Sequence, residues 1–185
     1  MKLPPQAKQV FKGIIYDVYH WEQEMFDGSR QTFEMLKRPD TLQVIAIQGD
    51  KILIGHESQP TKKDFYTLLG GRAEAGEEPL QSAKRELLEE SGTQSDDWEL
   101  YKAYEPVHKI DWIVHTYIAR DCQKTTEPKL DAGEKIAVEA VDFDQFIDII
   151  DSDKFWGNEF RFDIVRMKLE PSKLEEFKKK LYLTN

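Results

Sequence analysis

Three glutamates in one short stretch of the chain have the type and spacing to hold a metal cation. Glu86, Glu89 and Glu90 lie at i, i+3 and i+4, so a helix would place their carboxylates on one face. Each pair of like charges at such spacing costs a helix roughly 0.2–0.5 kcal/mol. Proteins bind Mg²⁺ through a few carboxylates together with substrate phosphates. The spacing indicates a candidate magnesium site, although a lone Glu-rich face is more often solvated surface.

The neighbouring residues predict the helix that must position these glutamates. Pro79 suits the first helical position, and Gly92 suits the left-handed residue just past the helix end. Apolar residues recur between them at helical spacing, so one face can pack on a core. These residues are Leu80, Ala83, Leu87 and Leu88.

The glutamates also belong to a longer pattern, Gly-x5-Glu-x7-Arg-Glu-Leu-x-Glu-Glu-x-Gly. Its positions are filled by Gly71, Glu77, Arg85, Glu86, Leu87, Glu89, Glu90 and Gly92. The segment resembles the Nudix box, the signature of Nudix hydrolases. It departs at Thr93, where the family prefers an aliphatic or aromatic residue. Eight fixed positions at fixed spacing make this a far more specific match than a single Gly-rich loop.

The resemblance implies a reaction and a set of site residues. Nudix hydrolases cleave nucleoside diphosphates linked to another moiety, with water attacking the pyrophosphate link while divalent metal holds the phosphate oxygens. Mg²⁺ is the implied cofactor, with Mn²⁺ as an alternative. The implied metal ligands are Glu86, Glu89, Glu90 and the backbone carbonyl of Gly70.

Other positions of the box have implied supporting roles. Arg85 would orient the glutamates, which suits its planar fork of donors, and Glu77 would brace the loop before the helix. Gly71 and Gly92 would be structural. The simplest alternative for Arg85 is an i, i+4 salt bridge to Glu89, which is compatible with the functional role.

The group that accepts a proton from water is implied to lie on a later loop. Residues 130–136 are similar to an acidic cluster of the ADP-ribose pyrophosphatase branch. Glu134 is the first choice, Asp131 the second and Glu127 a distant third. Ala132 and Gly133 stand where relatives often have further acids, so the assignment of the base stays open.

The layout is closest to the ADP-ribose pyrophosphatase and nucleotide-sugar branch, although its motifs are incomplete. Glu57-Ser58-Gln59-Pro60 only partly matches the Gln-x-Arg-Pro of that branch, and Leu69 replaces a proline. ADP-ribose or a nucleotide sugar is the favoured substrate. The alternatives are a non-catalytic nucleotide-sensing Nudix domain and a nucleoside triphosphate pyrophosphatase. Phe65, Tyr66 and Trp112 could stack on a base or simply pack on a strand.

Composition narrows the setting in which such an enzyme would act. The net charge of −9 disfavours a nucleic-acid partner, which would need a basic face. No apolar run approaches the ~20 residues that span a bilayer, so no membrane partner is expected. Cys122 is the only cysteine, which agrees with a cytoplasmic location. An isoprenoid diphosphate isomerase, a Nudix-like enzyme, would need a cysteine before the box.

The expected fold is α+β, an α/β/α sandwich with the mixed central sheet of the Nudix fold. Residues 1–185 are expected to form one domain. Its parts are N-terminal strands (1–40), the core (41–150) and C-terminal helices (151–185). Residues 10–20 are predicted as one strand, with a hairpin turn at Asp27–Gly28. Ser172 is predicted to cap the last helix. The N-terminal hairpin resembles the strands that commonly mediate a homodimer in the ADP-ribose branch, so a homodimer is expected.

Overall fold

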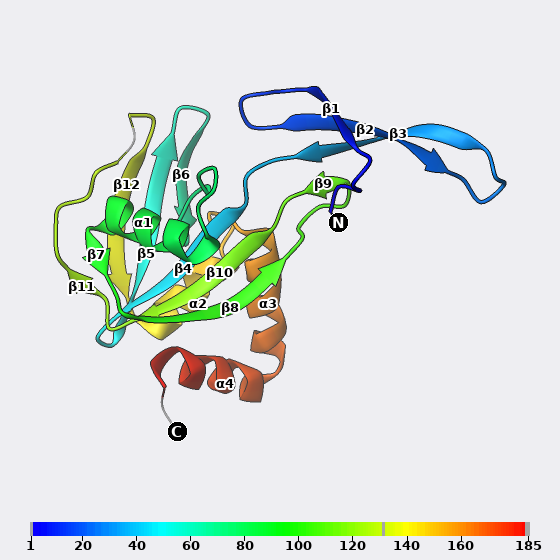
Figure 1. Ribbon diagram of the computed structural model, residues 1–185. Helices are drawn as coiled ribbons and strands as arrows, with labels where there is room; N and C mark the ends of the chain where they lie inside the picture. The colour runs from blue at the N-terminus through cyan, green and yellow to red at the C-terminus, as the bar shows by residue number, and fades with distance from the viewer. Residues whose placement is uncertain (1, 131, 184–185) are drawn as a thin grey trace.

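A computed structural model of the chain describes residues 2–130 and 132–183. Figure 1 labels the helices and strands in chain order. They are β1 (Lys8–Phe11), β2 (Asp17–Glu24), β3 (Arg30–Lys37), β4 (Thr41–Gln48), β5 (Lys51–Gln59), β6 (Lys62–Thr67), α1 (Pro79–Ser91), β7 (Thr93–Gln94), β8 (Asp97–Tyr104), β9 (Ile110–Asp111), β10 (Val114–Arg120), β11 (Gln123–Lys124), β12 (Lys135–Val141), α2 (Phe143–Asp151), α3 (Asn158–Leu169) and α4 (Pro171–Tyr182).

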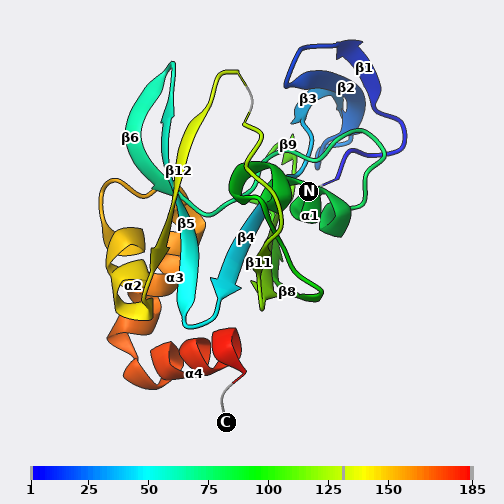
Figure 2. The same ribbon diagram turned by 90° about the vertical axis from the view of Figure 1, so that its left-hand side faces the viewer.

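The central sheet is mixed, as the sequence predicted. Its strands follow the order β12-β5-β4-β10-β8, and β6 pairs with β5 beside this path. Strands β4 and β10 are parallel, whereas the other pairs are antiparallel. Helix α1 covers one face and α2 and α3 cover the other, which Figure 2 shows with the sheet between them. The α+β sandwich is therefore confirmed.

Strand β4 shows why the sheet has a hydrophobic cluster on each of its two faces. Side chains of a strand point alternately to its two faces. Leu42 and Val44 are fully buried and cluster with residues of α1. Ile45 and Ile47 belong to the other cluster, with residues of α2, α3 and α4. The nearly continuous apolar run of this strand is thus buried on both sides and fixes the layers.

The N-terminal strands form a separate sheet of order β1-β2-β3-β9 at one end of the molecule (Figure 1). The predicted turn is present, because Met25 N–H donates to the Ser29 carbonyl oxygen at 2.8 Å and Gly28 has φ +82°. The prediction of one strand over residues 10–20 was wrong. The chain turns between β1 and β2, where Gly13 N–H donates to Asp17 Oδ1 at 3.1 Å.

The C-terminal helices are present, but the predicted cap of the last one was wrong. Helix α4 begins at Pro171, with Glu170 at the N-cap and no side-chain cap bond. Proline is pre-organised for the first helical position, so Ser172 lies inside the first turn. Within residues 2–130 and 132–183, none of the helices has the length and apolar character needed to traverse a bilayer.

Candidate active site

Helix α1 has the ends that the sequence predicted. Pro79 occupies the first turn, and Gly92 is left-handed with φ 69° while its N–H donates to the Leu88 carbonyl oxygen at 2.8 Å. Ala83 and Leu87 are fully buried in the cluster that contains Leu42. This stripe docks the helix on the sheet and thereby fixes where its glutamates lie.

The segment around Gly70 and Gly71 runs beside the beginning of β4. Val44 N–H donates to the Leu69 carbonyl oxygen at 2.7 Å, and Leu42 N–H donates to the Gly71 carbonyl oxygen at 2.9 Å. These bonds extend the sheet past the end of β6. They place the glycine pair next to the glutamate face of α1.

Both glycines are required by close approach. A Cβ on Gly71 would lie 2.5 Å from the carboxylate of Glu86. A Cβ on Gly70 would lie 2.1 Å from the Leu42 carbonyl oxygen, and Gly70 has φ +139°, a conformation that side chains disfavour. Glu86 can take its position only because Gly71 lacks a side chain, and the segment can run beside Leu42 only because Gly70 lacks one.

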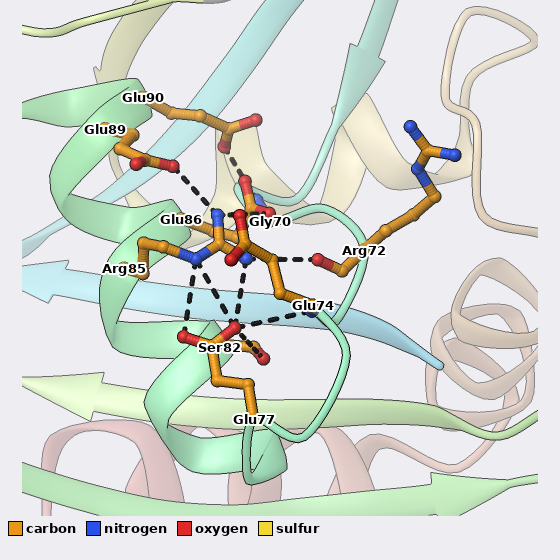
Figure 3. A network of polar contacts seen from close by, with 9 residues as sticks. All are labelled: Gly70, Arg72, Glu74, Glu77, Ser82, Arg85, Glu86, Glu89 and Glu90. Carbon is orange, nitrogen blue, oxygen red and sulfur yellow. Dashed lines mark hydrogen bonds and ion pairs between the residues drawn. The ribbon is translucent and has the colours of Figure 1, made fainter. Parts of the chain in front are cut away.

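Glu90 is the most buried carboxylate of the site, with 5% of its surface exposed. It accepts a hydrogen bond from Gly70 N–H at 2.7 Å (Figure 3). Burial is the main cause that raises the pKa of Glu90 well above its usual value, and the Gly70 hydrogen bond opposes it. The charges of Glu57, Glu86 and Glu134 raise the pKa of Glu90 further.

Arg85 ties the other two glutamates to the preceding loop. Its Nη1 lies 2.9 Å from both Glu86 Oε1 and Glu89 Oε2, so the i, i+4 salt bridge to Glu89 is formed. Its Nη2 donates to Glu77 Oε2 at 3.3 Å and to the Arg72 carbonyl oxygen at 3.1 Å (Figure 3). The guanidinium therefore holds Glu86 and Glu89 in place and joins α1 to the loop before it.

Glu77 and Glu86 have opposite pKa directions for clear reasons. The hydroxyl of Ser82 donates to Glu77 at 2.6 Å and is the main cause that lowers the Glu77 pKa, with Arg85 adding to it. Burial raises the pKa of Glu86, and the ion pair with Arg85 only partly offsets this. Glu77 is thus stabilised in its ionised form by its partners, whereas the positive charge near Glu86 does not fully compensate for its burial.

The described parts of the chain contain no group of three His, Cys, Asp or Glu side chains arranged to hold a metal ion as they stand. The hydrogen bonds explain why, since Arg85 holds Glu86 and Glu89 while Gly70 holds Glu90. The donor set nevertheless consists of carboxylates, which suit hard cations such as Mg²⁺ and Mn²⁺. The residues present therefore fit the implied cofactor.

Glu57 is a buried acid that the sequence interpretation did not assign to the site. It lies on β5 with 7% of its surface exposed, and it accepts hydrogen bonds from Thr67 Oγ1 and from Gln59 Nε2, the latter at 3.4 Å. Burial raises its pKa despite these donors. Leu53 lies four residues earlier on the same face of β5 and packs against the α1 cluster. Alternation along the strand places residue 57 on the same buried face as Leu53. An acidic residue at such a buried position was the sequence signal that could have identified Glu57.

Glu134, the first choice for the proton acceptor, lies near the box glutamates. Its charge contributes to the raised pKa of both Glu86 and Glu90. It also lines a cavity of about 410 Å³ together with Glu57. Asp131 lies outside the described residues. Glu127 is exposed and pairs with Lys124 at 3.2 Å.

The aromatic candidates have different surroundings. Phe65 is 2% exposed, which favours packing over base stacking. Tyr66 stacks on His56 with ring centroids 4.5 Å apart. The indole N–H of Trp112 donates to Thr41 Oγ1 at 3.1 Å, and the Arg38 guanidinium lies 4.4 Å from the centroid of its ring.

Comparison with known proteins identifies the family. Residues 37–162 match the NUDIX domain, which is more than half of the chain, so the chain belongs to this family. With every charged position of its box present, it is a Nudix-type pyrophosphohydrolase, as the sequence predicted.

Individual relatives refine this picture. The chain is 26% identical to an ADP-ribose pyrophosphatase of Bacillus subtilis (strain 168) over 167 residues, covering 88% of this chain and 90% of that protein. It is 27% identical over 150 residues to a methanol dehydrogenase activator of Bacillus methanolicus, covering 79% and 75%. A crystal structure of an ADP compounds hydrolase has the same fold, with a TM-score of 0.67 at 19% identity over 91% of this chain and 94% of that one.

Replacing Glu90 by Gln is expected to raise the melting temperature of the metal-free protein at pH 8. Because burial raises the folded pKa above the usual 4.5, ionisation of Glu90 destabilises the fold as the pH rises through that folded pKa. Glutamine never ionises, so the gain should shrink as the pH falls toward 4.5. Thermal melts in EDTA at several pH values would measure it.

Exposed Glu127 supplies the matched control, since Glu127→Gln should not change the melting temperature. Added Mg²⁺ should stabilise the wild type by mass action but not Glu90→Gln. A Glu90→Gln variant that melts below the wild type at pH 8 would contradict the direction of the Glu90 pKa.

The two glycines should respond differently to alanine. Gly70→Ala meets a backbone carbonyl and a positive φ, so it should lower the melting temperature. Gly71→Ala meets only the end of the Glu86 side chain, so it should fold and displace that carboxylate. Thermal melts and Mn²⁺ titration followed by electron paramagnetic resonance would separate the two effects. Unchanged Mn²⁺ affinity in Gly71→Ala would refute the role given to this glycine.

Proposed function

We propose that this protein is a divalent-metal-dependent hydrolase of the pyrophosphate bond in a nucleoside diphosphate linked to another moiety. ADP-ribose is favoured, with a nucleotide sugar next. The observation that carries the proposal is the placement of Glu86 and Glu90 against the glycine backbone by α1, with Glu89 and Glu86 both held by Arg85. The resemblance to a bacterial ADP-ribose pyrophosphatase over most of both chains supports the substrate class.

Glu86, Glu89, Glu90 and the Gly70 carbonyl would hold the cation, Mg²⁺ or alternatively Mn²⁺. When bound, the ion supplies Lewis acidity to the phosphate oxygens and lowers the pKa of the attacking water. Glu90 is buried and Glu86 is partly buried, and both have raised pKa values. Positive charge between them would relieve both burial and mutual repulsion, so the metal-free site is poised to bind a cation.

Side chains around the proposed cation site would carry out proton transfer and orient the glutamates. Glu134 would accept the proton of the attacking water, since it lines the cavity beside Glu57 and lies within electrostatic reach of Glu86 and Glu90. Asp131 is the second choice for that proton. Arg85 would keep Glu86 and Glu89 oriented through its 2.9 Å contacts.

The same proposal includes the setting of the enzyme. Its partner would be a small nucleotide substrate in the cytoplasm, with no nucleic acid or membrane. A homodimer would form through the N-terminal strands. The apolar residues exposed there support this, notably Phe11 at 61% and Ile14 at 102% exposure, since a second copy would cover them.

A substrate panel with Mg²⁺ would test the reaction. ADP-ribose or a nucleotide sugar should be hydrolysed at the pyrophosphate link, and Glu89→Gln should lower kcat at least about 100-fold because several kcal/mol of transition-state stabilisation depend on the ion. Glu176→Gln, at an exposed position on α4, is the matched control and should retain activity. Product analysis by chromatography would report both.

Two results would overturn the assignment. Tight binding of the panel without hydrolysis would favour a nucleotide sensor. Faster hydrolysis of nucleoside triphosphates than of ADP-ribose would favour a triphosphate pyrophosphatase.

The dimer can be tested separately by light scattering after gel filtration. Ile14→Asp places a charge in the exposed apolar segment and should convert the dimer to a monomer. Leu169→Asp, on α3 at 78% exposure, should leave the oligomeric state unchanged. A monomeric wild type would refute this part of the proposal.

A further inference from the structure

Arg72 and Arg38 flank one threonine at the beginning of β4. Thr41 and Arg72 form a cross-strand pair, which Ala73 N–H extends by donating to the Asp40 carbonyl oxygen at 2.9 Å. Directly paired residues project their side chains from the same face of a sheet. Arg38 Nη2 lies 3.3 Å from Thr41 Oγ1 on this same side chain. The Arg38 guanidinium therefore contacts Thr41 directly, and the side chain of Arg72 leaves the same face of the sheet from the neighbouring segment.

Neither arginine is neutralised by a carboxylate within residues 2–130 and 132–183. The two acids beside Arg38 are engaged elsewhere. Asp40 accepts from Ile113 N–H at 2.9 Å and lies 3.1 Å from His115, while Asp111 pairs with Lys37 at 3.8 Å. One face of the sheet therefore carries two positive charges without a carboxylate partner among the described residues, in a chain whose net charge is −9. This juxtaposition favours an anion between them.

Arg72 is tied to the carboxylate site through its backbone only. It follows Gly71 directly, and its carbonyl oxygen accepts from Arg85 Nη2 at 3.1 Å. Figure 3 shows its side chain extending away from the glutamates. Arg85 itself is occupied by Glu77, Glu86 and Glu89. Arg72 is therefore an arginine of this loop whose guanidinium remains available for a ligand.

Arg38 is held in place by aromatic rings. Its guanidinium lies 4.4 Å from the ring centroid of Trp112 and 5.7 Å from that of Tyr16. Stacking on aromatic faces orients a guanidinium and leaves its edge free to donate hydrogen bonds. The Trp112 indole is fixed in turn by its bond to Thr41. The cation is thus pre-organised before any ligand arrives.

We propose that Arg72 and Arg38 form an anion subsite for the substrate phosphate that lies farther from the cation-binding glutamates. This inference rests on the proposed function and adds a recognition element to it. The planar donor fork of arginine matches phosphate oxygens. A pyrophosphate would then lie with one phosphate on the carboxylate side of Gly71 and the other on the arginine side.

Steady-state kinetics with ADP-ribose and Mg²⁺ would test the subsite. Arg72→Ala should raise KM by about tenfold or more, as expected for the loss of a charge-assisted contact, while kcat stays within about threefold of the wild type. Arg72→Lys should recover part of the loss, and Arg38→Lys should have a smaller effect than Arg38→Ala. Arg166→Ala makes the same charge change at an exposed position on α3 and should match the wild type.

Equilibrium measurements keep this test separate from the hydrolytic function. Calorimetric titration with ADP should show weaker binding to Arg72→Ala than to Arg166→Ala, whether or not the wild type hydrolyses ADP-ribose. Mn²⁺ affinity and melting temperature should be the same in both variants, which a disrupted carboxylate site would not allow. If the wild type does not hydrolyse ADP-ribose but its binding of ADP still depends on Arg72, the proposed hydrolytic function is overturned and the subsite is not. Equal KM and equal ADP affinity in the two variants would overturn the subsite alone.

Discussion

The candidate site depends on the close approach of helix α1 to the backbone of Gly70 and Gly71. Glu86 lies where a side chain on Gly71 would stand, and Glu90 accepts the N–H of Gly70 at 2.7 Å. The hydrogen bonds of Leu42 and Val44 to the same segment keep the glycines beside α1. A helix, a loop and a central strand are therefore joined by contacts that tolerate almost no added volume.

The close packing of α1 on the Gly70–Gly71 segment concentrates negative charge in a region that is largely shielded from solvent. Glu57, Glu86 and Glu90 all have pKa values raised by burial, and of these three Arg85 pairs only with Glu86. Its other partners are Glu77 and the more exposed Glu89. Burial of uncompensated charge works against folding. A cation bound between the carboxylates would remove that cost, so the same arrangement that weakens the metal-free fold favours binding of the ion.

Strand β4 separates two regions of opposite charge. Leu42 faces α1 and its carboxylates, whereas Thr41 projects to the other face with Arg72, and Arg38 contacts its hydroxyl. Because successive residues of a strand point in opposite directions, Leu42 and Thr41 contact groups on opposite faces of the sheet.

Much of the site could be predicted from the sequence because its signals are local. The spacing of Glu86, Glu89 and Glu90, the proline at Pro79 and the left-handed glycine at Gly92 are all set within one helix. Local spacing decides which side chains share a helical face before any tertiary contact forms. The apolar run of β4 likewise predicted a buried strand, which the structure contains.

The sequence did not reveal site residues whose role depends on a partner far away in the chain. Glu57 joins the site only because β5 packs in the cluster that contains α1. Arg72 shares a face of the sheet with Thr41, which Arg38 contacts, only because residue 72 pairs with residue 41. The break between β1 and β2 was missed because β-branched and aromatic residues favour extended backbone on either side of a turn. By itself the sequence determined the helix, its acidic face and the glycines. Only the tertiary structure decided which other charges surround them, since strand pairing joins residues far apart in the chain.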